Sequence, residues 1–203
     1  MPNPDTNGRP KRRKRTPDEA RQETLAAARQ LLLSGGPGAV TLANVGRESG
    51  MSHTNIIHHF GSAGGLQTAL MESMVRDLAV ALDEVVGRIE VDVTAPQSII
   101  NSVFDAFDKG GGGQLAAWLV LSQEFDHIDV IRSAVNDLVG ALSSKFPGAV
   151  DVEARMRTAV LLIAISAFGD AVIGPYLREM LSLEEDAMRI LVTRIIPFFY
   201  LAG

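Results

Sequence analysis

The sequence contains no cysteine. This absence excludes a disulfide framework, thiolate metal ligands and a cysteine nucleophile, and it is typical of proteins in a reducing compartment. The positive charge near the N-terminus is not followed by an apolar stretch, so this region does not resemble a secretory signal peptide. We therefore expect a cytoplasmic protein.

Aromatic residues make up only 5% of the 203 residues, and no stretch alternates apolar and polar residues as a strand would. The apolar residues recur instead at steps of three and four, which places them on one face of a helix. One such series is Leu66, Leu70, Met74, Leu78 and Leu82. With glycine and proline breakers between the series, the sequence predicts an all-α fold of about nine helices.

The net charge of −5 is unevenly distributed. Residues 1–60 hold nine Lys and Arg against five Asp and Glu, a net charge of +4, whereas residues 61–203 carry −9. Residues 1–15 end in five consecutive cations, which repel one another and bury nothing, so we predict a disordered arm there. The arm either contacts nucleic acid or serves as a solubilising tail, and the DNA-reading motif predicted below for residues 41–60 favours the first role. Its cations are Lys11, Arg12, Arg13, Lys14 and Arg15.

Residues 41–60 have the pattern of two short helices joined by a glycine-containing turn. Thr41 and Ser52 can each cap a helix, and Gly50 suits the turn between the helices because glycine accepts a positive φ. The residues expected to face inward are Leu42, Val45, Ile56 and Phe60. This arrangement predicts a DNA-reading helix-turn-helix motif.

The exposed side of the second helix carries short polar side chains that can reach base edges and phosphates. An Asn at position 55 can pair with adenine through two hydrogen bonds, and a Thr at position 54 can contact a thymine methyl group or a phosphate. Free N–H groups at the helix start suit a phosphate oxygen. The predicted DNA contacts outside the arm are Thr41, Ser52, His53, Thr54, Asn55 and His58.

Residues 21–70 resemble the tetracycline-repressor (TetR) family without gaps. The resemblance rests on the helix from Thr24 to Leu32, on Gly36 at its end, and on the start of a linking helix at Gly61-Ser62 and Leu66. The helix-turn-helix positions that match are Thr41, Val45, Gly50, Ser52, His59 and Phe60. The resemblance implies a three-helix DNA-binding head over residues 16–62. It also implies a body over residues 63–203 that binds a ligand and dimerises through its last two helices.

Three positions depart from the family pattern. Ile57 replaces the usual phosphate-contacting Tyr, Ala63 replaces a Lys, and Ala43 stands where a basic residue is common. Since phosphate contacts supply much of the affinity for DNA, the head alone should bind weakly. We expect the basic arm to compensate by entering a neighbouring minor groove.

The body contains aromatic and polar residues that could line a pocket for a small, largely apolar ligand. The candidates are Phe104, Phe107, Trp118, Gln123, Phe125, Phe168 and Asp170. For each aromatic residue, ordinary core packing is the alternative. Asp170 lies in an apolar helix, where a carboxylate needs a partner, and this partner is a ligand, an Arg or a group at the dimer axis.

An apolar stripe on the last helix predicts a homodimer interface, with a core role as the alternative. The stripe consists of Leu191, Ile195, Ile196 and Phe199.

Residues 159–177 are apolar enough to suggest a membrane span, but Gly174 and Pro175 interrupt them, so we expect no membrane partner. The histidines at 53, 58 and 59 lack the spacing of a metal site, so we expect neither a metal nor a cofactor.

The sequence therefore predicts a transcriptional repressor that a small molecule releases from palindromic double-stranded DNA. The alternative is a DNA-binding regulator without an inducer, controlled by its abundance or by a protein partner. We find no arrangement of residues typical of catalysis and predict that the chain is not an enzyme.

Overall fold

The computed structural model describes residues 16–89, 92, 94–123, 129–147 and 150–197. Over these ranges the chain forms ten α-helices and one short 3-10 helix, η1, with no strand, so the all-α prediction is confirmed. The helices are α1 (Pro17–Gly35), η1 (Pro37–Ala39), α2 (Leu42–Ser49), α3 (His53–Phe60), α4 (Ala63–Val86), α5 (Ala95–Phe107), α6 (Gly112–Leu121), α7 (Asp129–Ser144), α8 (Val152–Val172), α9 (Gly174–Leu181) and α10 (Ala187–Ile195).

Over the described ranges the structure has one α-helix more than the nine predicted, because the apolar stretch near the C-terminal end is broken into two helices, α8 and α9. Helix α8 ends at Val172 and α9 begins at Gly174, with the two axes bent by 77°. Pro175 has no N–H group and so cannot continue the hydrogen bonding of α8, whereas it suits the first turn of α9. Among the described helices none is by itself long and apolar enough to cross a membrane. Only the bent α8–α9 pair passes by length and composition.

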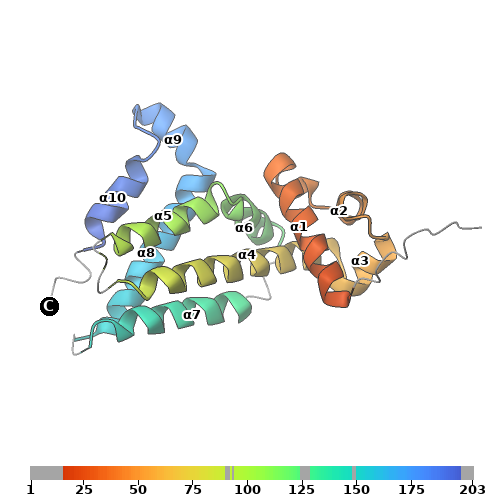
Figure 1. The fold of residues 1–203 in the computed structure, drawn as a ribbon. Helices are drawn as coiled ribbons and strands as arrows, with labels where there is room; N and C mark the ends of the chain where they lie inside the picture. The colour runs from red at the N-terminus through yellow and green to blue at the C-terminus, as the bar shows by residue number, and fades with distance from the viewer. Residues whose placement is uncertain (1–15, 90–91, 93, 124–128, 148–149, 198–203) are drawn as a thin grey trace, which may run out of the picture.

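Helices α1–α3 form a head at one end of the molecule, and α4 runs from this head into a body made of the remaining helices (Figure 1). The head core includes Ala28, Leu32, Val45 and Ile56, all of which are buried. The body core is separate and surrounds Phe104 on α5. Helix α4 contributes to both cores, with Leu66 and Leu70 in the head core and Leu82 in the body core.

The head core continues into two helices of the body. The side chain of Gln67, near the start of α4, is buried and donates a hydrogen bond of 3.1 Å to the carbonyl oxygen of Val40, just before α2. Leu115 and Leu119 of α6 are also buried in the head core. Helices α4 and α6 are therefore the elements through which the body contacts the head.

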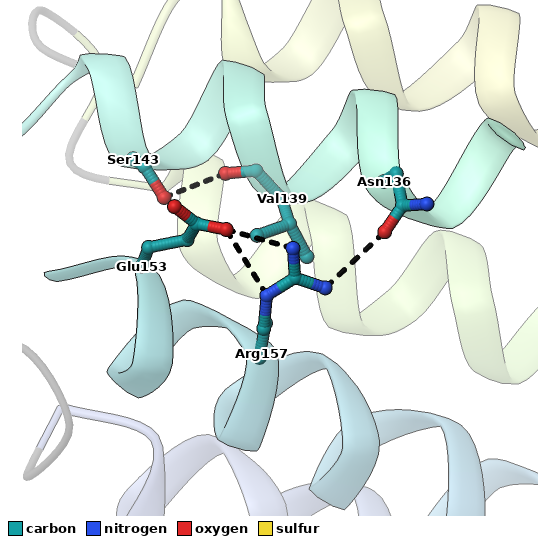
Figure 2. A network of polar contacts seen from close by, with 5 residues as sticks. All are labelled: Asn136, Val139, Ser143, Glu153 and Arg157. Carbon is teal, nitrogen blue, oxygen red and sulfur yellow. Dashed lines mark hydrogen bonds and ion pairs between the residues drawn. The ribbon is translucent and has the colours of Figure 1, made fainter. Parts of the chain in front are cut away.

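A surface network joins α7 to α8 (Figure 2). The guanidinium group of Arg157 donates hydrogen bonds to Glu153 Oε1 on its own helix, at 2.7 and 3.1 Å, and to Asn136 Oδ1 on α7, at 3.2 Å. Both side chains of the Arg157–Glu153 ion pair are exposed. An exposed pair of this kind contributes at most about 1 kcal/mol.

Candidate DNA interface and apolar groove

The predicted helix-turn-helix is present as α2, a turn at Gly50, and α3. Thr41 Oγ1 accepts a hydrogen bond of 3.2 Å from the backbone N–H of Asn44, and Ser52 Oγ accepts one of 3.3 Å from Asn55. Gly50 has φ of 68°, a left-handed conformation that would strain a residue with a side chain. Caps at both helix starts and a glycine in the turn thus fix the angle between the two helices.

The outer side of α3 presents the predicted polar contacts to solvent. His53, Thr54, Asn55 and His58 are all exposed, while Ile56 beneath them is fully buried. Ser52 is also exposed. Its hydroxyl oxygen accepts the capping hydrogen bond from Asn55, so the hydroxyl proton can still be donated to another group. Thr41 is half-buried and used as a cap, so the structure supports a structural role for it more directly than a DNA contact.

An apolar groove of about 320 Å³ lies between α4, α5, α6, α7 and α8. Every described residue that lines it is apolar or glycine, and the walls include Met71, Met74, Leu78, Phe107, Ala164 and Phe168. The rings of Phe107 and Phe168 meet edge to face, with their centroids 6.3 Å apart. The apolar walls that the structure describes suit a hydrocarbon chain or ring.

Residues 25–69 match the family model described as bacterial regulatory proteins, tetR family. The head is a TetR-family domain. The resemblance seen in the sequence is therefore confirmed, and the matched residues include the whole helix-turn-helix and the start of α4. No curated relative matches the chain by sequence.

Solved structures extend the likeness in fold to the body of the chain. A protein from Mesorhizobium loti assigned to the TetR family superposes with a TM-score of 0.63 at 12% identity, covering 93% of this chain and 98% of that one. A TetR-family transcriptional regulator from Pectobacterium atrosepticum gives 0.62 at 16% identity, covering 91% and 95%. The fatty acid degradation regulator FadR from Bacillus halodurans gives 0.59 at 15% identity, covering 91% and 96%. These likenesses establish a shared fold.

The structure describes six of the seven predicted ligand residues and does not bring these six together. Of the six, only Phe107 and Phe168 line the apolar groove. Phe104 has an exposed fraction of 1% and lies in the body core beneath the guanidinium group of Arg189, 5.3 Å from its ring centroid. Trp118 and Gln123 are exposed and line no part of the groove, and Phe125 lies outside the described residues.

Sequence reasoning missed the methionines of the groove. Met71 and Met74 lie on α4, and the helical spacing of Met74 only indicated that it faces inward. The flexible thioether side chain of Met adapts to irregular apolar space. Two Met residues on the linking helix were therefore the signal from which a groove beside this helix could have been predicted.

Asp170 is paired with an arginine of its own chain. Its Oδ1 atom accepts a hydrogen bond from Arg178 across the break between α8 and α9. Burial raises the pKa of the Asp170 carboxyl above its ordinary value, although the Arg178 charge acts in the opposite direction. Of the alternatives open for Asp170, the structure shows the ion pair with an Arg.

Of the four residues predicted for the dimer interface, the three that the structure describes differ in their exposure to solvent. Leu191 is exposed and Ile195 is half-buried, but Ile196 has an exposed fraction of 1% and packs in the core of its own chain. This corrects the sequence prediction for Ile196, because successive residues of a helix point about 100° apart and only one side of α10 faces outward. Phe199 lies outside the described residues.

The exposed apolar surface is larger than the predicted stripe on the last helix, because it includes residues of α8 and α9 as well as α10. Its members on α8, on α9 and in the turn between them are Leu161, Ile165, Ile173, Tyr176, Leu177, Met180 and Leu181. Sequence reasoning missed α9, although apolar residues there recur at steps of one and four. Across the described ranges, no group of three or more His, Cys, Asp or Glu is placed to hold a metal ion.

Proposed function

We propose that this chain is a DNA-binding transcriptional regulator whose α3 helix lies in the major groove. The observation that supports this most directly is the exposed polar face of α3, held on a capped helix-turn-helix of the TetR family. The Asn55 side chain reads a base edge, Thr54 contacts a methyl group or phosphate, and the histidines at 53 and 58 contact the flanking backbone.

The regulator acts as a homodimer on a palindromic duplex. Two identical heads must reach half-sites separated by about 34 Å, one helical turn of DNA. The apolar surface of α8, α9 and α10 supports this proposal, because a monomeric protein rarely exposes so many large apolar residues on adjoining helices. A two-fold axis through this surface would bury it and leave both heads free.

Replacing both Thr54 and Asn55 by Ala is expected to abolish the preference of the dimer for its selected duplex. Each good base contact contributes about 1–3 kcal/mol of discrimination. The backbone N–H of Asn55 remains in the Ser52 cap, so the fold of α3 is retained. The duplex is obtained by selection from a random-sequence library, and binding is measured by fluorescence anisotropy against random competitor.

The matched control is Gln30→Ala, an exposed substitution on α1 away from α3. It should leave the ratio of selected to random affinity unchanged. If the double variant keeps that ratio within about twofold, less than the smallest base contact would supply, α3 does not read the bases.

The apolar groove is the ligand site of the regulator, and its occupant is a small, largely apolar molecule that releases the DNA. A body without a cavity would favour control by abundance or by a protein partner, whereas this body has a groove between five helices. Met71, Met74 and Leu78 place α4 in the groove wall, and α4 carries the buried Gln67–Val40 contact to the head. A ligand that shifts α4 therefore changes the separation of the two heads. Typical coupling of about 1–3 kcal/mol corresponds to a 5–150-fold change in affinity for DNA.

Filling the groove with Ala164→Phe is expected to weaken binding of an uncharged apolar probe, N-phenyl-1-naphthylamine, by about tenfold or more, equivalent to about 1.4 kcal/mol. The added ring occupies space between α4 and α8, and affinity for the selected duplex should be retained. The control is Val80→Phe, at an exposed position of α4 that does not line this groove. Equal probe fluorescence titrations for the Ala164→Phe variant and the parent would exclude the groove as the binding site.

A further inference from the structure

The break between α8 and α9, which we call the elbow (residues 170–178), is built around one ion pair. Asp170 lies one turn before the break and Arg178 one turn after the start of α9, and their side chains meet across it. The two side chains have exposed fractions of only 15% and 16%. Because both charges are largely removed from water, each depends on the other for its stabilisation.

The ion pair occupies the space that a side chain at position 174 would need. Gly174 is buried, and a Cβ atom there would lie 2.6 Å from Asp170 Oδ1 and 2.7 Å from Arg178 Nη1. The ion pair thus lies directly against the backbone at Gly174. Pro175 then ensures that the chain cannot continue as one helix. These features together hold the 77° bend.

Neighbouring charges do not compete for this pair. Arg189 of α10 donates a hydrogen bond of 2.9 Å to Asp105 on α5 and lies over the ring of Phe104. Lys109 is also paired with Asp105, at 3.3 Å. Asp108 and Arg189 act on Asp170 only through longer-range electrostatics of opposite sign. Arg178 is therefore the cation committed to Asp170.

Residues of the elbow line a second groove, of about 380 Å³, between α8, α9 and α10. Apart from Asp170 and Arg178, its walls are mainly apolar and include Ile165, Ile173, Leu177 and Leu191. On the same helices, the side chains of Tyr176 and Met180 protrude, with exposed fractions of 62% and 76%. One surface thus offers both a hollow and protruding apolar side chains. A two-fold interface needs this kind of self-complementary surface.

We propose that Asp170 and Arg178 determine the specificity of an interface with a second copy of this chain, by fixing the elbow so that its groove receives an apolar side chain of the partner. The inference rests on the homodimer of the proposed function and names the residues that shape its surface. In the dimer the partner covers the elbow groove and completes the removal of the ion pair from water. A chain that carries only one of the two charges would bring an uncompensated charge into the interface, which is strongly unfavourable.

The test compares Asp170→Asn, Arg178→Met and the exchanged double variant Asp170→Arg with Arg178→Asp. Dimer dissociation constants are measured by sedimentation velocity on the full chain, and thermal unfolding is followed by circular dichroism. Each single variant is expected to weaken the dimer by about 10- to 100-fold, since one partially buried charge loses its partner. The exchanged variant should recover most of that loss. Gly174→Ala, which keeps both charges but displaces them, should behave like the single variants.

Glu153→Gln and Arg157→Met provide the matched control on the same helix. Their ion pair is exposed, so the dimer dissociation constant should stay within about twofold of the parent value. If the single variants fold but dimerise like the parent, or if the exchanged variant recovers nothing, the specificity role is wrong while the dimer stands. If the single variants lower the melting temperature without changing the dimer dissociation constant, the ion pair serves only the fold, and the inference fails. A parent chain that stays monomeric at all concentrations would instead refute the proposed homodimer itself.

Discussion

Deleting residues 1–15 is expected to lower affinity for the selected duplex by about 100-fold or more at low salt and to flatten its salt dependence. At three positions of the head where the family resemblance implies phosphate-contacting or basic side chains, this chain has Ala43, Ile57 and Ala63. The arm carries five consecutive cations that can supply such contacts instead. If all five neutralise phosphates, the slope of log affinity against log salt falls by about 4–5 per head on deletion. Anisotropy titrations between about 50 and 200 mM salt, the range over which phosphate contacts change affinity most visibly, measure both quantities.

Two variants separate charge from length in the arm. Removing residues 1–8 leaves all five consecutive cations in place and should preserve the salt slope. Replacing residues 11–15 by Ser in the full chain should reproduce the deletion. An unchanged slope after full deletion would mean that the arm is a solubilising tail.

Replacing Phe104 by Ala is expected to destabilise the protein by about 3–5 kcal/mol, the range for a fully buried aromatic residue. Its ring fills the centre of the body core and also supports the Arg189 guanidinium group. For a chain of this length the melting temperature should fall by about 6–20 °C. Urea unfolding and thermal unfolding, both followed by circular dichroism, measure the effect.

Phe168→Ala is the matched comparison because its ring is half-buried in the groove wall. It should destabilise the protein clearly less than Phe104→Ala and should weaken binding of N-phenyl-1-naphthylamine. If Phe104→Ala instead leaves stability almost unchanged and abolishes probe binding, Phe104 would belong to the ligand site rather than to the core.

Signals that act within a few residues were readable from the sequence. Thr41 and Ser52 cap the two helices of the helix-turn-helix, and Gly50 takes the left-handed conformation. Each of these features depends on hydrogen bonds over three or four residues or on a single φ angle. The head was therefore predictable element by element, together with the polar face of α3.

Residues close together on one helix have different surroundings in the body. Phe104 and Phe107 lie on α5, yet the first is in the core and the second lines the groove. Leu191 and Ile196 belong to the same predicted stripe on the last helix, but one faces outward and the other inward. Helical spacing shows that a side chain is on an apolar side, but not which neighbouring helix covers that side.

The sequence by itself determined the helical class, the capped helix-turn-helix and the contrast between a basic N-terminus and an acidic body, because these follow from local hydrogen bonding, periodicity and charge. The tertiary structure decided which apolar residues line a groove, which remain exposed, and that Asp170 pairs with Arg178 across a sharp bend. These features depend on contacts between helices far apart in the chain, and such contacts are set by how the helices pack and not by the residue type at any one position.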